Sequence, residues 1–186
     1  MARAFVFIDG SNFYFRLKDL TSKLNGKFSL LDFNYKKFSE WLVKPNELME
    51  IHYYIGAIKR QINNDKVERM YADQQRLIAK LQKQNIFVTL GQLIRHPDKT
   101  YHEKGVDVRL AVEMIRYARE DKYDNGYLLS SDTDLVPAIE EVQTFGKIIQ
   151  YVGAAKGQSF GISKIANDVR LLRPEDIKQF LSQSLL

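Results

Sequence analysis

The stretch Tyr127-Leu-Leu-Ser-Ser-Asp132-Thr-Asp134-Leu-Val-Pro137 decides the fold that we expect for this chain. It reads as an apolar strand that runs into a polar turn and then opens a helix, where a proline is tolerated only near the first turn. Phe5-Val-Phe-Ile-Asp9-Gly-Ser-Asn12, near the N-terminus, repeats this design. Ligands of an open parallel sheet bind where its strands end. The acids that follow these two strands therefore mark a candidate site.

Working outward from these two stretches, strand-like and helix-like segments alternate along the chain. The alternation predicts a single α/β domain over residues 1–186, with three layers and a five-stranded, mostly parallel sheet. We expect a motif-bearing core over about 4–155 and a C-terminal helical extension over about 160–186. The expected strands cover 4–8, 50–58, 85–94, 127–131 and 147–152, and the expected helices cover 13–20 or 13–24 (capped by Ser11-Asn12), 34–43, 64–84, 106–119, 133–145, 160–168 and 174–184.

Two of these helices carry a prediction about what they bury. The helix over 106–119 should turn Val108, Ala111, Val112, Ile115 and Ala118 inward, because these residues recur at helical spacing. The apolar face of the C-terminal helix should cover the sheet of its own chain, and contact with a second copy in a homodimer is the alternative.

Composition and charge narrow the class of protein. The chain has 186 residues, 45% of them hydrophobic, and it contains no apolar run long enough to span a membrane. It lacks cysteine, which excludes disulfides and thiolate zinc sites, and its first residues do not resemble a signal peptide. We therefore expect a cytoplasmic protein without a membrane partner. The net charge of +5 is a mild bias toward polyanionic partners.

Four acids could meet at one edge of the predicted sheet: Asp9, Asp132, Asp134 and Asp107, which stands in Lys104-Gly-Val-Asp107 at the start of a helix. Each also has a structural interpretation, as a helix cap or as a first-turn acid that complements the helix dipole. Gathered in one crevice, however, the carboxylates would repel one another and raise one another's pKa values. A divalent cation would relieve that repulsion.

The ligand types indicate which cation this would be. The three histidines show no metal-binding spacing and cysteine is absent, so an oxygen-only site favours Mg²⁺ or Mn²⁺ over zinc. Such a site supports phosphate-ester chemistry. The sequence contains neither a P-loop nor a dinucleotide-binding Gly-x-Gly-x-x-Gly after the first strand. Asp9-Gly-Ser-Asn12 also lacks the second acid that aspartyl-phosphate phosphatases carry two residues after the first.

Three segments resemble the signatures of a known family. Phe7–Asn12, Lys104–Asp107 and Leu129–Pro137 are similar, in this order, to the three motifs of NYN domains, which are PIN-like nucleases. The resemblance covers roughly residues 4–155 and is greatest to the LabA-like bacterial branch. It implies a PIN-like sheet and a ribonuclease that depends on Mg²⁺ or Mn²⁺.

The resemblance also assigns roles to single residues. It implies that Asp9, Asp107, Asp132 and Asp134 bind the metal and catalyse, and that Asn12 orients a ligand or water. Ser131 stands where such motifs often have glycine, a departure that removes no acid.

Basic and aromatic residues near the same edge could guide RNA. Lys59 and Arg60 follow the second predicted strand, Arg95 follows the third, and Lys104 belongs to the motif before Asp107. Such charges contact phosphates without reading sequence, and Tyr14 could stack on a base. The alternative is that the charges are solvated and the aromatic side chain belongs to the core.

We expect these features to serve a metal-dependent ribonuclease that hydrolyses phosphodiester bonds, with single-stranded RNA as its partner. An RNA-binding regulatory module with little or no catalysis is one alternative. A small-molecule phosphatase, which would not need the basic rim, is another.

Overall fold

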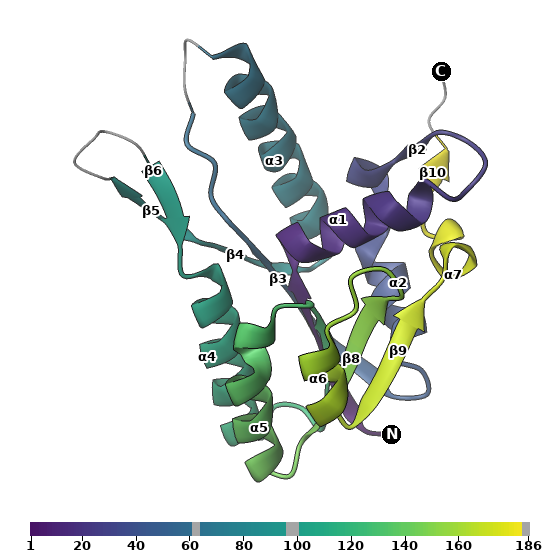
Figure 1. The fold of residues 1–186 in the computed structure, drawn as a ribbon, viewed down its shortest axis with the longest axis vertical. Helices are drawn as coiled ribbons and strands as arrows, with labels where there is room; N and C mark the ends of the chain where they lie inside the picture. The colour runs from purple at the N-terminus through teal and green to yellow at the C-terminus, as the bar shows by residue number, and fades with distance from the viewer. Residues whose placement is uncertain (61–63, 96–100, 184–186) are drawn as a thin grey trace.

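The computed structural model describes residues 1–60, 64–95 and 101–183, and the side chains of 93–95, 101–103 and 183 are outside the description. A six-stranded sheet, parallel in every pairing, forms the centre of the domain. Helices cover both of its faces (Figure 1). The strands run in the order β4 (Phe87–Leu90), β3 (Glu47–Ile55), β1 (Arg3–Asp9), β7 (Asn125–Leu129), β8 (Ile148–Ala154) and β9 (Asp168–Leu172).

The central strand β1 shows why the domain needs three layers. Its residues from Ala4 onward are all buried, and they alternate between two apolar cores. Val6 and Ile8 pack with α1 (Gly10–Thr21), α2 (Tyr35–Leu42) and α7 (Pro174–Lys178). Phe5 and Phe7 pack with α4 (Val106–Arg119), α5 (Val136–Thr144) and α6 (Phe160–Ile165). A parallel strand that is covered on both faces is apolar throughout its length. A further helix is α3 (Asp65–Lys83), and 3₁₀ turns lie at Leu30–Asp32 (η1) and Thr133–Leu135 (η2).

The chain reverses its direction of travel across the sheet between β1 and β7. From β1 it moves outward to β3 and β4, then returns to β7 on the other side of β1 and continues to β8 and β9. β1 and β7 are therefore direct neighbours, with Ile8 opposite Leu129. This is the switch point at which open α/β sheets bind ligands, and the two strands end there in Asp9 and the turn that holds Asp132.

The expected count of five strands is wrong, because β9 forms a sixth. Two of the first three residues of Asp168-Val-Arg-Leu-Leu172 are charged, so β9, an edge strand, lacks the apolar run of a buried strand. Arg170 lies over the Trp41 ring, 4.1 Å from its centroid. The C-terminal extension is thus not purely helical: α7 stops at Lys178, and β10 (Ser182–Gln183) pairs with β2 (Phe28–Ser29).

The C-terminal segment nevertheless packs on its own chain. Ile177 and Phe180 are buried in the core that contains α1 and α2. This agrees with the prediction that the apolar residues of the C-terminal segment pack within their own chain.

The region after the third expected strand also differs from the prediction. β4 ends at Leu90, and Gln92–Arg95 (β5) pairs antiparallel with Tyr101–Lys104 (β6) as a separate hairpin. We expected one long strand followed by a polar loop. Most of β5 lies within the strand expected over 85–94, whereas β6 lies within the expected polar loop. Residues 96–100 are outside the described part of the chain.

Helix α4 has the expected bounds, and its predicted inward face is correct in part. Ala118 is buried, and Ala111 and Ile115 pack partly buried against the same core. Val108 and Val112, however, are 66% and 52% exposed, and Leu110 and Met114 are buried in their place. The buried stripe includes Glu113, whose carboxylate accepts hydrogen bonds from Tyr54 Oη (2.9 Å) and Arg109 Nε (2.6 Å). Two apolar stripes with the same spacing made the sequence ambiguous, and the one that contains an acid is the buried one.

Candidate functional site

Asp9 ends β1 and begins α1. Its Oδ1 accepts a hydrogen bond from Asn12 N (3.0 Å), so Asp9 is the N-cap of α1 in place of Ser11 or Asn12. Only 6% of Asp9 is exposed. Burial is the main cause that raises the pKa of the Asp9 carboxyl, and the negative charge of Asp132 adds to it. The hydrogen bonds of Asp9 act in the opposite direction. Capping and burial thus hold one carboxylate rigidly at the switch point.

Ser130 connects Asp9 to the turn after β7. Its hydroxyl donates to Asp9 Oδ2 at 2.9 Å and accepts from Asp132 N at 3.2 Å. Asp132 is half-buried, and its Oδ1 accepts from Asp134 N (3.0 Å), which caps the turn η2. The capping interpretation is therefore correct for both Asp9 and Asp132. It does not compete with a role in binding, because capping fixes where each carboxylate lies.

Asp107 reaches the same place from a third segment. It lies in the first turn of α4, a helix that begins at Val106. Gly105, just before the helix, has a left-handed backbone (φ 84°) that turns the chain from β6 into α4. A hollow of about 320 Å³ at the carboxyl edge of the sheet is lined by Asp9, Asp107 and Asp132. Its other lining residues are Ser11, Asn12, Phe15, Gly56 and Val106. We call this feature the acid hollow.

Asp134 and Asn12 differ in their relation to the acid hollow. Asp134 is exposed and does not line it, so three of the four predicted acids share the hollow. Asn12 lines it and accepts a hydrogen bond at Oδ1 from Ser131 Oγ (3.1 Å). Ser131, where the family motifs often have glycine, thus connects the turn after β7 to α1.

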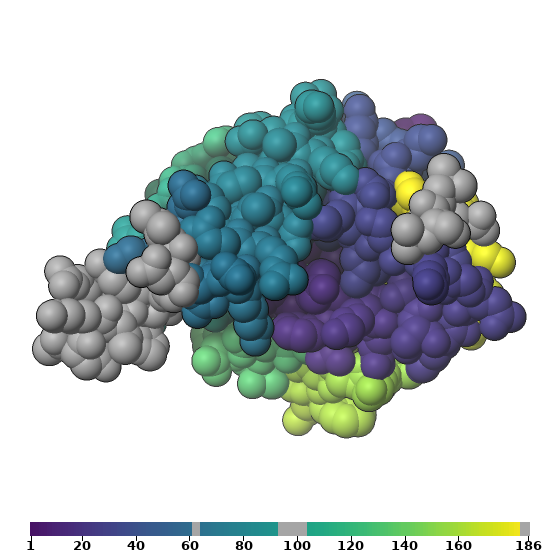
Figure 2. Space-filling model, turned by 90° about the horizontal axis from the view of Figure 1, so that it is seen from above, coloured from purple at the N-terminus to yellow at the C-terminus, as the bar shows by residue number. Residues whose placement is uncertain are grey.

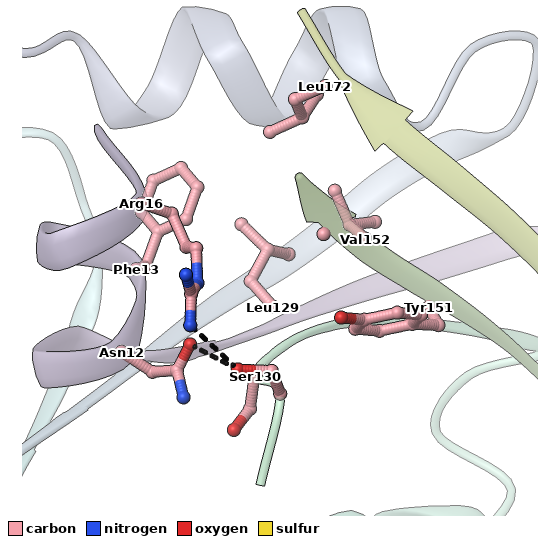
Figure 3. A pocket seen from close by; sticks show the side chains of 10 residues that line it. Asn12, Phe13, Arg16, Leu129, Ser130, Tyr151, Val152 and Leu172 are labelled. Carbon is pink, nitrogen blue, oxygen red and sulfur yellow. Dashed lines mark hydrogen bonds between the residues drawn. The ribbon is translucent and has the colours of Figure 1, made fainter. Parts of the chain in front are cut away.

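Arg16 belongs to this network and was not predicted from the sequence. Its Nη2 donates to Ser131 Oγ (3.3 Å) and its Nη1 to the main-chain oxygen of Lys156 (3.0 Å), so the guanidinium lies beside Asn12 (Figure 3). The chain passes so close at Gly157 that a Cβ there would collide with the guanidinium. Arg16 stands one turn after Asn12, and that i, i+4 spacing is the one signal that could have identified it.

The predicted RNA-binding residues are spread around this edge. Lys59 and Arg60 are exposed beyond β3, and Arg60 pairs with Glu68 (Nε to Oε1, 3.1 Å). Lys104 is exposed at the end of β6 and lines a second hollow with α4. Arg95 ends β5, and its side chain is outside the description. Tyr14 is exposed on α1 and lines an apolar groove next to the acid hollow, so the alternative that it belongs to the core is wrong.

The acid hollow suits a hard cation in its donor chemistry, because its ligating groups are carboxylate and amide oxygens. Within the described residues, however, no three histidine, cysteine or carboxylate side chains lie close enough to form a complete metal centre. Mg²⁺ commonly takes only one or two protein carboxylates and completes its shell with water and substrate phosphate. The residues present fit that open kind of site.

Fold and site together define an α/β domain of the PIN-like, three-layer type with acids at its switch point. A family model of the NYN domain matches residues 3–170, and the chain belongs to the NYN domain family. The fold also resembles that of a Vibrio parahaemolyticus protein of unknown function, known from a crystal structure. The two are 18% identical with a TM-score of 0.66, over 97% of this chain and 96% of the other. No curated protein matches the chain.

Proposed function

We propose that this NYN domain is a metal-dependent ribonuclease that hydrolyses phosphodiester bonds in single-stranded RNA. The observation that carries the proposal is the meeting of Asp9, Asp107 and Asp132, from three separate segments, around one hollow. Carboxylates of like charge come together at a cost, and that cost is offset when they share a cation. Mg²⁺ or Mn²⁺ is the cation that an oxygen-only site favours.

The three acids would hold the cation, and Asp134 would support them from the exposed side of the same turn. Bound there, the cation would supply an activated water and would stabilise charge on the phosphoryl group. Ser130 keeps the Asp9 carboxylate oriented through its 2.9 Å hydrogen bond. Asn12 offers its amide nitrogen to a water or a phosphate oxygen, because its amide oxygen already accepts from Ser131.

The basic side chains would bring the RNA backbone to the acids. Lys59 and Arg60 follow β3, and Arg95 and Lys104 are the last residues of the hairpin strands β5 and β6. Such basic residues contact phosphates regardless of sequence. The net charge of +5 adds a long-range attraction for RNA. From the resemblance of the motifs to the LabA-like branch and the absence of cysteine, we infer that this activity is cytoplasmic. In the described part of the chain no helix has the length and apolar character to cross a bilayer.

The proposal is tested by incubating a labelled single-stranded RNA and a phosphomonoester with Mn²⁺, with EDTA, and with two variants. We expect wild-type protein to cleave the RNA only with Mn²⁺ and to leave the phosphomonoester intact. Asp9→Asn should reduce cleavage at least about a hundredfold. Asp134→Asn should reduce it about 10- to 100-fold, because Asp134 supports the site from outside the hollow. Cleavage that survives EDTA, or both substitutions, would contradict the proposal.

A regulatory RNA-binding module is the second candidate. It is favoured by the hydrogen bonds that already occupy both oxygens of Asp9, from Asn12 N and Ser130 Oγ. It is also favoured by the lack of a complete metal centre among the described residues. RNA binding without any Mn²⁺-dependent cleavage, over prolonged incubation, would select this second candidate.

A further inference from the structure

A long groove adjoins the acid hollow between α1 and α3. Its volume is about 660 Å³, within the range of small-molecule binding sites. The surface is visibly hollowed between these two helices when seen from above (Figure 2). The apolar residues that line it are Tyr14, Phe15, Phe28, Leu30, Leu31, Tyr53, Ile55, Ile58, Met70 and Leu77. We call it the apolar groove.

Two aromatic side chains of α1 stand exposed at this groove. The inward face of α1 is already supplied by Phe13, Leu17 and Leu20, which are buried. Tyr14 and Phe15 are 43% and 62% exposed, and their rings contact each other edge to face with centroids 5.7 Å apart. The core therefore does not use them. A single exposed apolar side chain is ordinary, but adjacent exposed aromatics in an apolar depression are typical of a ligand-binding groove.

The groove wall opposite α1 is firmly held. The buried side chain of Gln74 on α3 donates from Nε2 to the Gly56 carbonyl (2.7 Å) and accepts at Oε1 from Ile58 N (2.9 Å). These two bonds fix the segment after β3 against α3. The apolar groove is thus a preformed depression, which lowers the cost of ordering a ligand in it.

The apolar groove is continuous with the acid hollow. Ser11 and Phe15 line both, so a ligand can occupy the two at once. Lys18 adds a positive charge to the groove, and its one acid, Asp73, pairs with Arg76 (3.1 Å). A cation held by the carboxylates would let the hollow take an anionic group. A ligand that fits both features therefore has an anionic part at the hollow and flat, apolar faces in the groove.

We propose that the apolar groove binds nucleobases of a single-stranded RNA whose backbone crosses the acid hollow. Phe15, at the junction, stacks on the base next to the phosphate held in the hollow, and Tyr14 stacks on the following base. Aromatic stacking tolerates any base, so the groove selects unpaired nucleotides and not a particular sequence. A base paired in a duplex cannot enter. The inference rests on the proposed function in taking RNA as the ligand.

The test compares two oligomers of equal length and charge, oligouridine and an abasic ribose-phosphate chain. Affinity is measured by fluorescence anisotropy in EDTA, which prevents cleavage. We expect wild-type protein to bind oligouridine at least about tenfold more tightly than the abasic chain. Phe15→Ala and Tyr14→Ala should each remove most of this preference and leave the affinity for the abasic chain unchanged. Phe145→Ala is the matched control, because Phe145 is a partly exposed aromatic at the far end of α5.

Equal affinity of wild-type protein for the two oligomers would overturn the inference. That result would point to an apolar segment of a protein partner as the occupant. Because the comparison uses wild-type protein alone, it does not depend on whether a variant folds. Equal losses for both oligomers in Phe15→Ala would also overturn it. A protein that cleaves RNA but shows no base preference would refute the groove inference alone. A base preference without any Mn²⁺-dependent cleavage would support the groove and refute the nuclease.

Discussion

The β1–β7 pair carries acids at both of its ends, and the two ends treat them differently. At the amino end, Asp124 is held by Arg3, with Nη2 2.7 Å from Oδ1 and the main-chain N 2.7 Å from Oδ2. Asp121 pairs there with Arg3 and Lys147. At the carboxyl end, Asp9 and Asp132 form no ion pair within the described residues, and neutral donors orient them.

The contrast separates acids that stabilise the fold from acids that we propose to bind a cation. Arg3 lowers the pKa of the Asp124 carboxyl to about 2, whereas burial raises the pKa of Asp9. A group with a lowered acid pKa stabilises the folded state at neutral pH, and one with a raised pKa destabilises it. A buried carboxylate such as Asp9, which forms no ion pair with the described residues and whose pKa is raised, is typical of a binding or catalytic site.

The largest effect that we expect is loss of cleavage at the carboxyl end. Asp9→Asn and Asp132→Asn should each reduce the single-turnover rate with Mn²⁺ at least a hundredfold. Asparagine can still accept the capping hydrogen bonds, so the fold should persist. Thermal unfolding followed by circular dichroism provides the control. A variant that melts like the wild type and cleaves at the wild-type rate would remove that acid from the mechanism.

A smaller loss is expected at Arg16. Arg16→Met should reduce cleavage about 10- to 100-fold, because the guanidinium positions Ser131 and, through it, Asn12. Arg16→Lys should not restore activity, since one amine cannot reproduce two bonds in different directions. Lys156→Ala is the matched control: Arg16 contacts only the main-chain oxygen of Lys156, so that variant should cleave normally. Full activity of Arg16→Lys would show that only the positive charge matters.

At the amino end the effect should fall on stability. Asp124→Asn should lower the free energy of unfolding by roughly 1 kcal/mol at neutral pH, after allowance for solvent screening of a partly exposed pair. Because the folded pKa lies below the ordinary 3.8, this contribution is present above about 4 and is lost as the pH falls toward about 2. Urea unfolding at several pH values measures it. The cleavage rate of the folded variant should equal that of the wild type.

The smallest effect has the opposite sign. In EDTA, Asp9→Asn should unfold at a slightly higher temperature than the wild type at neutral pH, because the substitution removes a buried charge. The folded pKa of Asp9 exceeds its unfolded value, so the wild type regains this stability as the pH falls through the folded pKa. The difference in melting temperature should therefore shrink in acid. A variant that is less stable than the wild type at every pH would reverse our interpretation of Asp9.

The sequence predicted the acids at the carboxyl end of the sheet better than the residue that positions their neighbours. Asp9 and Asp132 could be found because an apolar strand followed by an acid is a local pattern, and parallel strands must end at one edge. Asp107 was found by its motif. Arg16 was missed, because its spacing from Asn12 is a weak local signal and its contacts, Ser131 and the loop at Gly157, lie more than 100 positions away.

The fold was predictable in the same uneven way. The buried strands and the limits of α4 followed from apolar periodicity. The edge strand β9 did not, because charged residues interrupt its sequence, and neither did β6, because Tyr101-His-Glu-Lys104 contains no apolar run. The inward face of α4 was predicted only in part, because Glu113 is buried with hydrogen bonds from Tyr54 and Arg109 while Val108 and Val112 are exposed.

The central claim is that Asp9 and Asp132, 123 positions apart, act as one unit. The most direct test is a double-mutant cycle on Mn²⁺-dependent single-turnover RNA cleavage, with Asp9→Asn, Asp132→Asn and the double variant. Residues that act together are strongly non-additive. We predict that the double variant retains the same residual rate as either single variant. Losses that multiply in the double variant would show independent roles, and they would contradict a shared cation at the acid hollow.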